Sequence, residues 1–160
     1  MSTAFPDSES RWLGLCLRSE SDQPHEWAAI GWTIRNRVLS TRYPNLYQAV
    51  VLSRKQFSYF NQFESMIDQP GALYAAALKG YAGDSSGWPE NDLAEAERCA
   101  RVLIRAPRWQ APFGVEVMHY YSPVSMTPKG SAPPWAPAAK RLFTPSGVDP
   151  ARFVFAAGVP

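Results

Sequence analysis

An apolar helix that begins at Pro24 is the sequence feature that most constrains the fold of this chain. Proline has a fixed φ and no N–H, so it suits the first turn of a helix. Apolar or small residues then recur at spacings of three and four, at Trp27, Ile30, Gly31, Ile34 and Val38. This spacing predicts a helix from Pro24 to about Ser40 with one face packed inward. Gly31 on that face permits the close approach of a neighbouring element.

A first helix is predicted over Arg11 to Ser19, with Asp7-Ser8 as its cap and Trp12, Leu15 and Cys16 on its buried face. Glu20 follows this helix and precedes the break Ser21-Asp22-Gln23-Pro24. The end of a helix carries partial negative charge, and aromatic surface disfavours an anion, so both effects favour a protonated carboxyl. Glu20 is therefore a candidate general acid, and the alternative is a solvated glutamate at a helix end.

The remaining elements are shorter. The sequence predicts helices over 46–52, 71–80 and 91–106, the last capped by Asn91, and a surface loop over 83–89. A loop over 53–60, rich in polar and aromatic groups, is expected to face a ligand or solvent. The alternation of side chains over 115–121 predicts a half-buried strand, and the segment 153–157 could pair with it. The segment 123–150 is predicted to be a long ordered loop. We expect one mostly helical α+β domain over residues 1–160 with a small antiparallel sheet.

Composition excludes some classes of function. The net charge of +2 and the lack of a basic run argue against nucleic-acid binding. Six Trp and seven Tyr suit either a groove that stacks sugars or an aromatic core. Cys16 and Cys99 lie on apolar helix faces and are expected to be free thiols, and His25 and His119 lack ligand-like spacing. We therefore expect no metal and no cofactor.

Polar clusters on separate elements follow the order of a known family. They are Glu20-Ser21, the run 28–38 that contains Arg35-Asn36-Arg37, Tyr43-Pro44-Asn45, Val50, Gln56-Phe57-Ser58, His119-Tyr120-Tyr121-Ser122-Pro123 and Pro134-Trp135-Ala136. Singly, Asn36 could cap a helix, Gln56 and Ser58 could satisfy loop backbone, and His119 could be an ordinary strand residue. In this order they resemble the SleB/CwlJ-type cell wall hydrolase family over most of the chain.

The resemblance maps the catalytic glutamate of the family onto Glu20. The family has a Gly-Glu-Ala-Arg-Gly-Glu stretch, which here stands as Ser19-Glu20-Ser21-Asp22. The spacing from Glu20 to Asn36 is shorter than usual, and the second family glutamate has no clean counterpart, with Pro24 or Glu26 in that region. Glu20-Ser21 also resembles the Glu-Ser pair of lysozyme-like lytic transglycosylases, so the resemblance implies a lysozyme-like domain.

The same resemblance implies that the substrate is peptidoglycan and the bond is the β-1,4 link between N-acetylmuramic acid and N-acetylglucosamine. Glu20 alone could run lytic transglycosylation, in which the muramic C6 hydroxyl attacks C1. The substrate contacts implied are Ser21, Asn36, Gln56, Phe57, Ser58, Tyr59, His119, Tyr120 and Tyr121. Two alternatives stay open: a hydrolytic muramidase in which Asp22 or Glu26 positions water, and a non-catalytic glycan-binding module.

The first ten residues have no basic start and no apolar stretch, so we expect no secretory signal and no transmembrane segment. We expect a monomer that is made in the cytoplasm and acts on the cell wall in the periplasm or outside the cell. A holin or a secretion machine would then deliver it. The bare catalytic domain favours a phage lysin over an injected toxin or a virion-associated lysin.

Overall fold

A central helix that separates a helical part from a small sheet organises the structure. The computed structural model describes residues 7–79 and 90–160, and about 52% of the chain is helical. The α-helices are α1 (Asp7–Glu20), α2 (Trp27–Leu39), α3 (Tyr47–Val51), α4 (Pro70–Ala77) and α5 (Glu90–Arg105). The 3-10 helices are η1 (Pro24–Glu26), η2 (Ser58–Met66), η3 (Arg108–Gln110), η4 (Pro123–Ser125) and η5 (Ala136–Ala138), and the strands are β1 (Val117–Tyr121), β2 (Arg141–Phe143) and β3 (Val154–Ala157).

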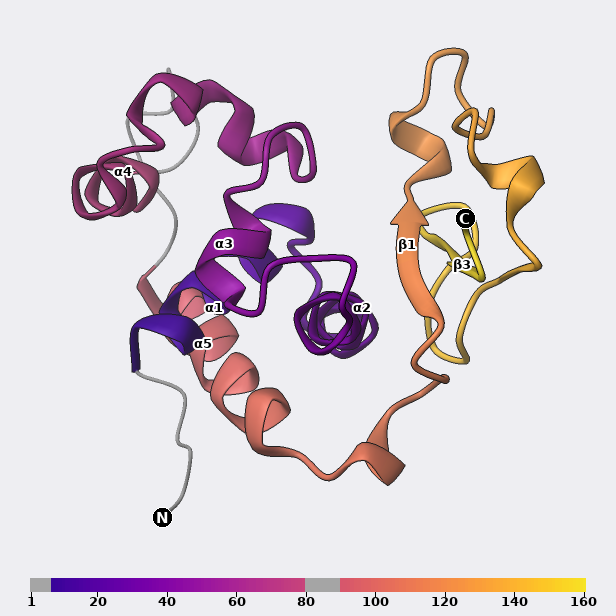
Figure 1. The fold of residues 1–160 in the computed structure, drawn as a ribbon, viewed down its shortest axis with the longest axis horizontal. Helices are drawn as coiled ribbons and strands as arrows, with labels where there is room; N and C mark the ends of the chain where they lie inside the picture. Colours follow the sequence, from indigo (N-terminus) through magenta and orange to yellow (C-terminus); the bar gives the residue numbers. More distant parts are fainter. Residues whose placement is uncertain (1–6, 80–89) are drawn as a thin grey trace.

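Helix α2 lies between the other helices and the sheet. It contacts α1, α3 and α5 on one side and β1 on the other (Figure 1). Its predicted inward face is confirmed, because Trp27, Ile30 and Ile34 are all buried. A methyl group on Gly31 would collide with the side chain of Leu103 on α5, so the close approach expected at this glycine is confirmed as well.

A second glycine contact joins α1 to α5. A Cβ atom added to Gly14 would lie 2.6 Å from the Cα atom of Glu97, a distance that real side chains do not adopt. Backbone atoms cannot move aside as a side-chain end can, so only glycine permits this packing distance. This contact was not predicted from the sequence.

The sheet is antiparallel and three-stranded, with β3 between β1 and β2. Phe155 on β3 is opposite Tyr120 on β1 and Phe143 on β2, and the three rings pack together at 5.6 and 6.3 Å from that of Phe155. Such cross-strand aromatic pairs stabilise antiparallel sheets. The predicted mostly helical α+β fold with a small antiparallel sheet is confirmed.

Several predicted element boundaries differ from the structure. The first helix starts at Asp7, so the residues expected to cap it lie within it, and the helix expected from Pro24 opens with the 3-10 turn η1. The segment 53–60 is not wholly a loop, because η2 begins at Ser58. The segment 123–150 contains β2, a strand of three residues too short to show alternation. The predicted loop 83–89 lies outside the described residues, and Asn91, predicted to cap the last helix, is instead the second residue of α5.

The strand predicted over 115–121 begins only at Val117. Val115 is 58% exposed, and a bulge between Val117 and His119 interrupts the expected alternation of side chains. No helix in the described part of the chain combines the length and hydrophobicity that crossing a bilayer requires.

Candidate active site

A cavity of about 500 Å³ lies where the helical part meets the sheet. This volume is within the range of small-molecule sites. Its walls come from the end of α1, from α2, from the segment 55–61 and from β1 with the residues that follow it. The lining residues are Ser19, Glu20, Arg37, Lys55, Gln56, Phe57, Ser58, Asn61, Tyr120, Tyr121, Ser122, Val124, Ser125, Met126, Arg152 and Phe153.

Glu20 supplies the one carboxyl group among the residues described as lining this cavity. It is the last residue of α1, which ends one residue beyond the predicted end at Ser19. Burial raises the pKa of Glu20 from 4.5 to about 7, although the hydrogen bond from Tyr120 and the charge of Arg37 act in the opposite direction. A carboxyl group with a pKa near 7 can both donate and accept a proton at neutral pH.

Tyr120 holds the carboxyl group of Glu20 from the sheet side. Its hydroxyl donates a hydrogen bond of 2.7 Å to Oε2 of Glu20. Burial and the nearby charge of Glu20 raise the pKa of Tyr120 well above its ordinary value, so the hydroxyl stays a donor. The Tyr120 ring packs on Phe153 and Phe155 at 5.8 and 5.6 Å between centroids, which fixes the hydroxyl in place.

Arg37 on α2 brings a buried positive charge to the cavity wall. Its Nε donates to the carbonyl oxygen of Met118 at 2.6 Å, and its Nη1 donates to Oε1 of Gln56 at 3.1 Å. The guanidinium also lies over the rings of Tyr43 and Phe57, at 5.1 and 5.5 Å. Arg37 therefore fixes the orientation of Gln56 and connects α2 to β1.

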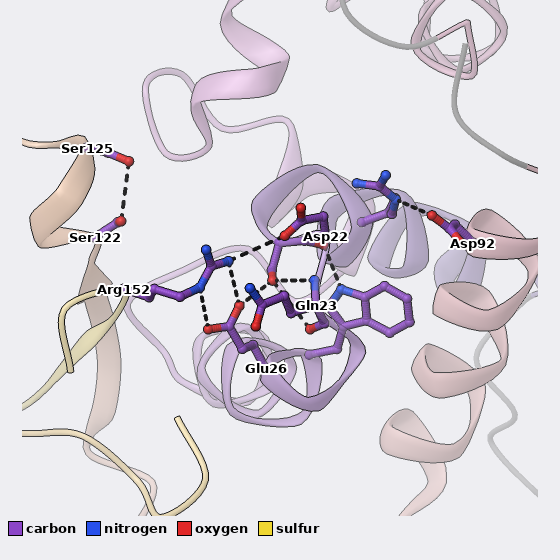
Figure 2. A network of polar contacts seen from close by, with 10 residues as sticks. Asp22, Gln23, Glu26, Asp92, Ser122, Ser125 and Arg152 are labelled. Atoms are coloured by element: carbon purple, nitrogen blue, oxygen red, sulfur yellow. Dashed lines mark hydrogen bonds and ion pairs between the residues drawn. The ribbon is translucent and has the colours of Figure 1, made fainter. Parts of the chain in front are cut away.

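The turn that follows Glu20 is fixed by a second carboxylate. Glu26 is wholly buried, and its Oε1 accepts a hydrogen bond of 2.5 Å from Ser21 Oγ. The Arg152 side chain extends from the C-terminal part of the chain and donates to both carboxylate oxygens at 2.9 Å, as Figure 2 shows. Although burial raises the pKa of Glu26, the hydrogen bonds from Arg152 and Ser21 hold it below its ordinary value. Trp27 Nε1 donates to the Ser21 carbonyl oxygen at 2.9 Å and fixes the same turn.

Six of the predicted site residues line the cavity together: Glu20, Gln56, Phe57, Ser58, Tyr120 and Tyr121. They come from three elements or loops that are far apart in the sequence. Parts of the Glu20, Gln56-Phe57-Ser58 and His119–Pro123 clusters thus converge at this cavity, whereas Tyr43-Pro44-Asn45, Val50 and Pro134-Trp135-Ala136 are not among its lining residues.

Ser21, Asn36, Tyr59 and His119 are not among the lining residues, and their expected role is corrected. The Ser21 hydroxyl is bound to Glu26. Asn36 Nδ2 donates to the carbonyl oxygens of Gly114 and Val117 at 3.0 and 2.9 Å and so ties α2 to the start of β1. Tyr59 is 1% exposed, and its hydroxyl donates to the Ala77 carbonyl oxygen.

His119 belongs to an aromatic cluster outside the cavity lining. Its Nε2 lies 3.3 Å from the Tyr43 hydroxyl in a hydrogen bond, and its ring packs on Trp135 at 5.2 Å. Burial, with the charges of Arg37 and Arg42, lowers the pKa of His119 to about 4. The ring is therefore neutral near pH 7 and has a packing role next to Tyr121, which contacts the same tryptophan.

Three cationic residues line the cavity without having been predicted from the sequence: Arg37, Lys55 and Arg152. Arg37 directly follows the predicted residue Asn36. Neighbouring positions on a helix face different sides, so the choice of Asn36 as the cavity-facing residue was wrong by one position. Lys55 precedes the predicted Gln56-Phe57-Ser58 cluster and carried no signal of its own. Arg152 is 126 positions from Glu26, and no local pattern reports such a contact.

Within residues 7–79 and 90–160 no three His, Cys, Asp or Glu side chains gather in a way that could hold a metal ion. Cys16 and Cys99 are free, as predicted. Comparisons of the chain with protein-family models, with curated proteins and with solved structures found no match.

Proposed function

We propose that this chain cleaves the glycan strands of peptidoglycan, at the β-1,4 bond between N-acetylmuramic acid and N-acetylglucosamine, as a lytic transglycosylase. The observation that carries the proposal is Glu20, a cavity-lining carboxyl group with a pKa of about 7. The motif order that resembles the cell wall hydrolase family supplies the substrate class.

Glu20 serves in turn as acid and as base. The protonated carboxyl first gives its proton to the glycosidic oxygen, and the bond between that oxygen and the muramic C1 breaks. The carboxylate then takes the proton of the C6 hydroxyl as O6 bonds to C1, which closes a 1,6-anhydro ring and restores the acid. Tyr120 keeps its hydrogen bond to Oε2 throughout, so the other oxygen of Glu20 is oriented for both proton transfers.

The rest of the cavity wall suits a sugar. Gln56, Ser58, Asn61, Ser122 and Ser125 supply amide and hydroxyl groups that match N-acetyl groups and sugar hydroxyls. Apolar surface comes from Phe57, Tyr121, Val124, Met126 and Phe153. The wall therefore offers both polar groups that can hydrogen-bond a sugar and apolar surface on which a sugar ring can pack.

The hydrolytic alternative needs a second carboxylate that positions water. Glu26 is wholly buried, and hydrogen bonds from Ser21 and Arg152 occupy its two oxygens. Asp22 has a side chain that is 70% exposed, and it does not line the cavity. These contacts favour the mechanism that uses one carboxyl group.

Mass spectrometry of the products from purified sacculi tests the proposal. We expect muropeptides that end in 1,6-anhydro-muramic acid, one water lighter than hydrolytic products, and none from the Glu20→Gln variant. Reducing muramic ends would replace transglycosylation by hydrolysis, with Asp22 as the first residue to substitute. Free stem peptides with intact strands would indicate an amidase, and binding without any release would indicate a glycan-binding module.

Delivery belongs to the same proposal. We propose a phage lysin that is released through a holin. The alternatives are a toxin injected by a secretion machine and a virion-associated lysin. Expression in the cytoplasm of a host with and without a holin tests whether the protein needs such a release route, because a chain that depends on a holin lyses only the culture that has one.

A further inference from the structure

The charges on the cavity wall are unequal. The described lining residues include three cationic side chains, those of Arg37, Lys55 and Arg152, but one carboxyl group, that of Glu20. Glu20 is itself partly protonated near neutral pH, because its pKa is about 7. The wall therefore carries an excess of positive charge, which in a cleft attracts anions.

The excess positive charge comes from Lys55 and Arg37. Arg152 is compensated by Glu26, whose carboxylate it contacts at 2.9 Å through Nε and Nη2, and by Asp22 at 3.5 Å. Lys55 has no ion-pair or hydrogen-bond partner for its ammonium group among the described residues. Arg37 donates only to neutral oxygens, those of Met118 and Gln56.

The backbone of Lys55 gives an independent reason to assign it a role. Its φ is 60°, in the left-handed region that glycine adopts readily and a lysine adopts at a cost of about 1 kcal/mol. It is the one non-glycine residue with a positive φ in the described chain. The turn that imposes this conformation closes through the hydrogen bond from Gln56 N to the Ser53 carbonyl oxygen at 3.2 Å. Strained residues that persist at cavities are characteristic of functional sites.

We infer that Lys55, together with Arg37 and Arg152, which line the same cavity, forms a carboxylate-binding subsite. The inference rests on the proposed function for the identity of the ligand. In peptidoglycan the carboxylate belongs either to the peptide stem or, where the stem has been removed, to the lactyl ether of N-acetylmuramic acid. The subsite selects muramic-acid-bearing strands over neutral chains of N-acetylglucosamine.

Calorimetric binding to the Glu20→Gln protein, which does not turn substrate over, tests the subsite. The probes are stem-bearing glycan fragments, the same fragments with stem carboxylates blocked as amides, amidase-treated strands with free lactyl carboxylates, and neutral N-acetylglucosamine oligomers. We expect the anionic probes to bind about tenfold more tightly than the neutral oligomers, with the preference weakening as salt is raised. Loss of the preference on amide blocking identifies the stem as the source, and its presence in amidase-treated strands identifies the lactyl group.

Substitution of Lys55 tests the residue itself. Lys55→Gly accepts the same backbone conformation without a charge, and we expect it to keep the fold and to bind anionic probes like neutral ones. Lys55→Arg should keep the preference, and the exposed Lys79→Met, which lies off the cavity lining, should match the parent. Equal binding of neutral and anionic probes by the parent, or unchanged anionic binding by Lys55→Gly, overturns the inference.

Digestion of sacculi by the wild-type protein separates this inference from the proposed function. Cleavage with no preference for anionic strands would support the proposed function and refute the subsite. Binding of anionic saccharides that depends on Lys55 but is not followed by cleavage would support the subsite and refute the proposed function. Binding of none of the probes removes the subsite.

Discussion

The hydroxyl of Tyr120 on β1 donates a hydrogen bond of 2.7 Å to the carboxyl group of Glu20 at the end of α1, across 100 positions of sequence. This contact joins the helical part to the sheet at the cavity. It stabilises the charged form of Glu20, while burial favours the neutral form more strongly, and the balance leaves the pKa of Glu20 at about 7.

Glu20→Gln should change how the stability of the folded protein depends on pH. Because the folded-state pKa of Glu20 is raised from 4.5 to about 7, its favourable contribution is fully present below about 4.5 and is lost as pH rises to 7. The wild type should therefore lose roughly 2–3 kcal/mol relative to the variant over this window, with no further change above it. Urea unfolding of both proteins between about pH 4 and pH 8 measures the gap. The assignment would be contradicted if the difference in unfolding free energy between the two proteins did not change with pH. It would also be contradicted if the wild type gained stability relative to the variant as pH rises.

Tyr120→Phe should move the pH dependence of activity upward. Without the hydrogen bond to its charged form, Glu20 keeps its proton to higher pH, so the alkaline limb of the kcat/KM profile should rise by about half to one pH unit. Tyr43→Phe is the matched control, since the Tyr43 hydroxyl bonds to His119 and not to Glu20. A shift toward acid in Tyr120→Phe, or an equal shift in both variants, would refute the role given to Tyr120.

Glu26 and Arg152 should be coupled in stability. Glu26→Gln leaves Arg152 with only the exposed Asp22 as a charged partner, at 3.5 Å, and we expect a loss of about 1–3 kcal/mol in the free energy of unfolding. In Arg152→Met the buried Glu26 loses both donors from that side chain and should be affected at least as strongly. The double variant should be less destabilised than the sum of the single ones, as a double-mutant cycle measured by denaturant unfolding would show. Additive losses would mean that the two residues do not act as a pair.

Gly14→Ala should destabilise the packing of α1 on α5. The added Cβ would meet the backbone of Glu97 at 2.6 Å, so the two helices must separate, at a cost of about 1–3 kcal/mol. Gly71→Ala on α4 is the control, because a Cβ there meets no atom within 4 Å and alanine favours the helix by about 0.5–1 kcal/mol. Thermal unfolding of the two variants should show shifts of opposite sign, and similar shifts would contradict the close contact at Gly14.

The sequence by itself determined the local elements and the place of the acid. Apolar spacing located the inward face of α2, the polar break after α1 put Glu20 at a helix end, and alternation together with apolar residues identified β1 and β3. These features follow from the periods of helix and strand, which neighbouring residues report directly. The strand β2 lacked such a signal because three residues do not establish a period.

Only the tertiary structure decided which side chains face the cavity. Asn36 and Tyr59 are polar enough to bind sugar, yet their polar atoms bond to backbone carbonyl groups inside the fold. Conversely, Arg37 and Arg152 reach the cavity wall through contacts with residues 19 and 126 positions away. Residue type states what a side chain can bond to, whereas its actual partner depends on long-range packing that sequence order does not report.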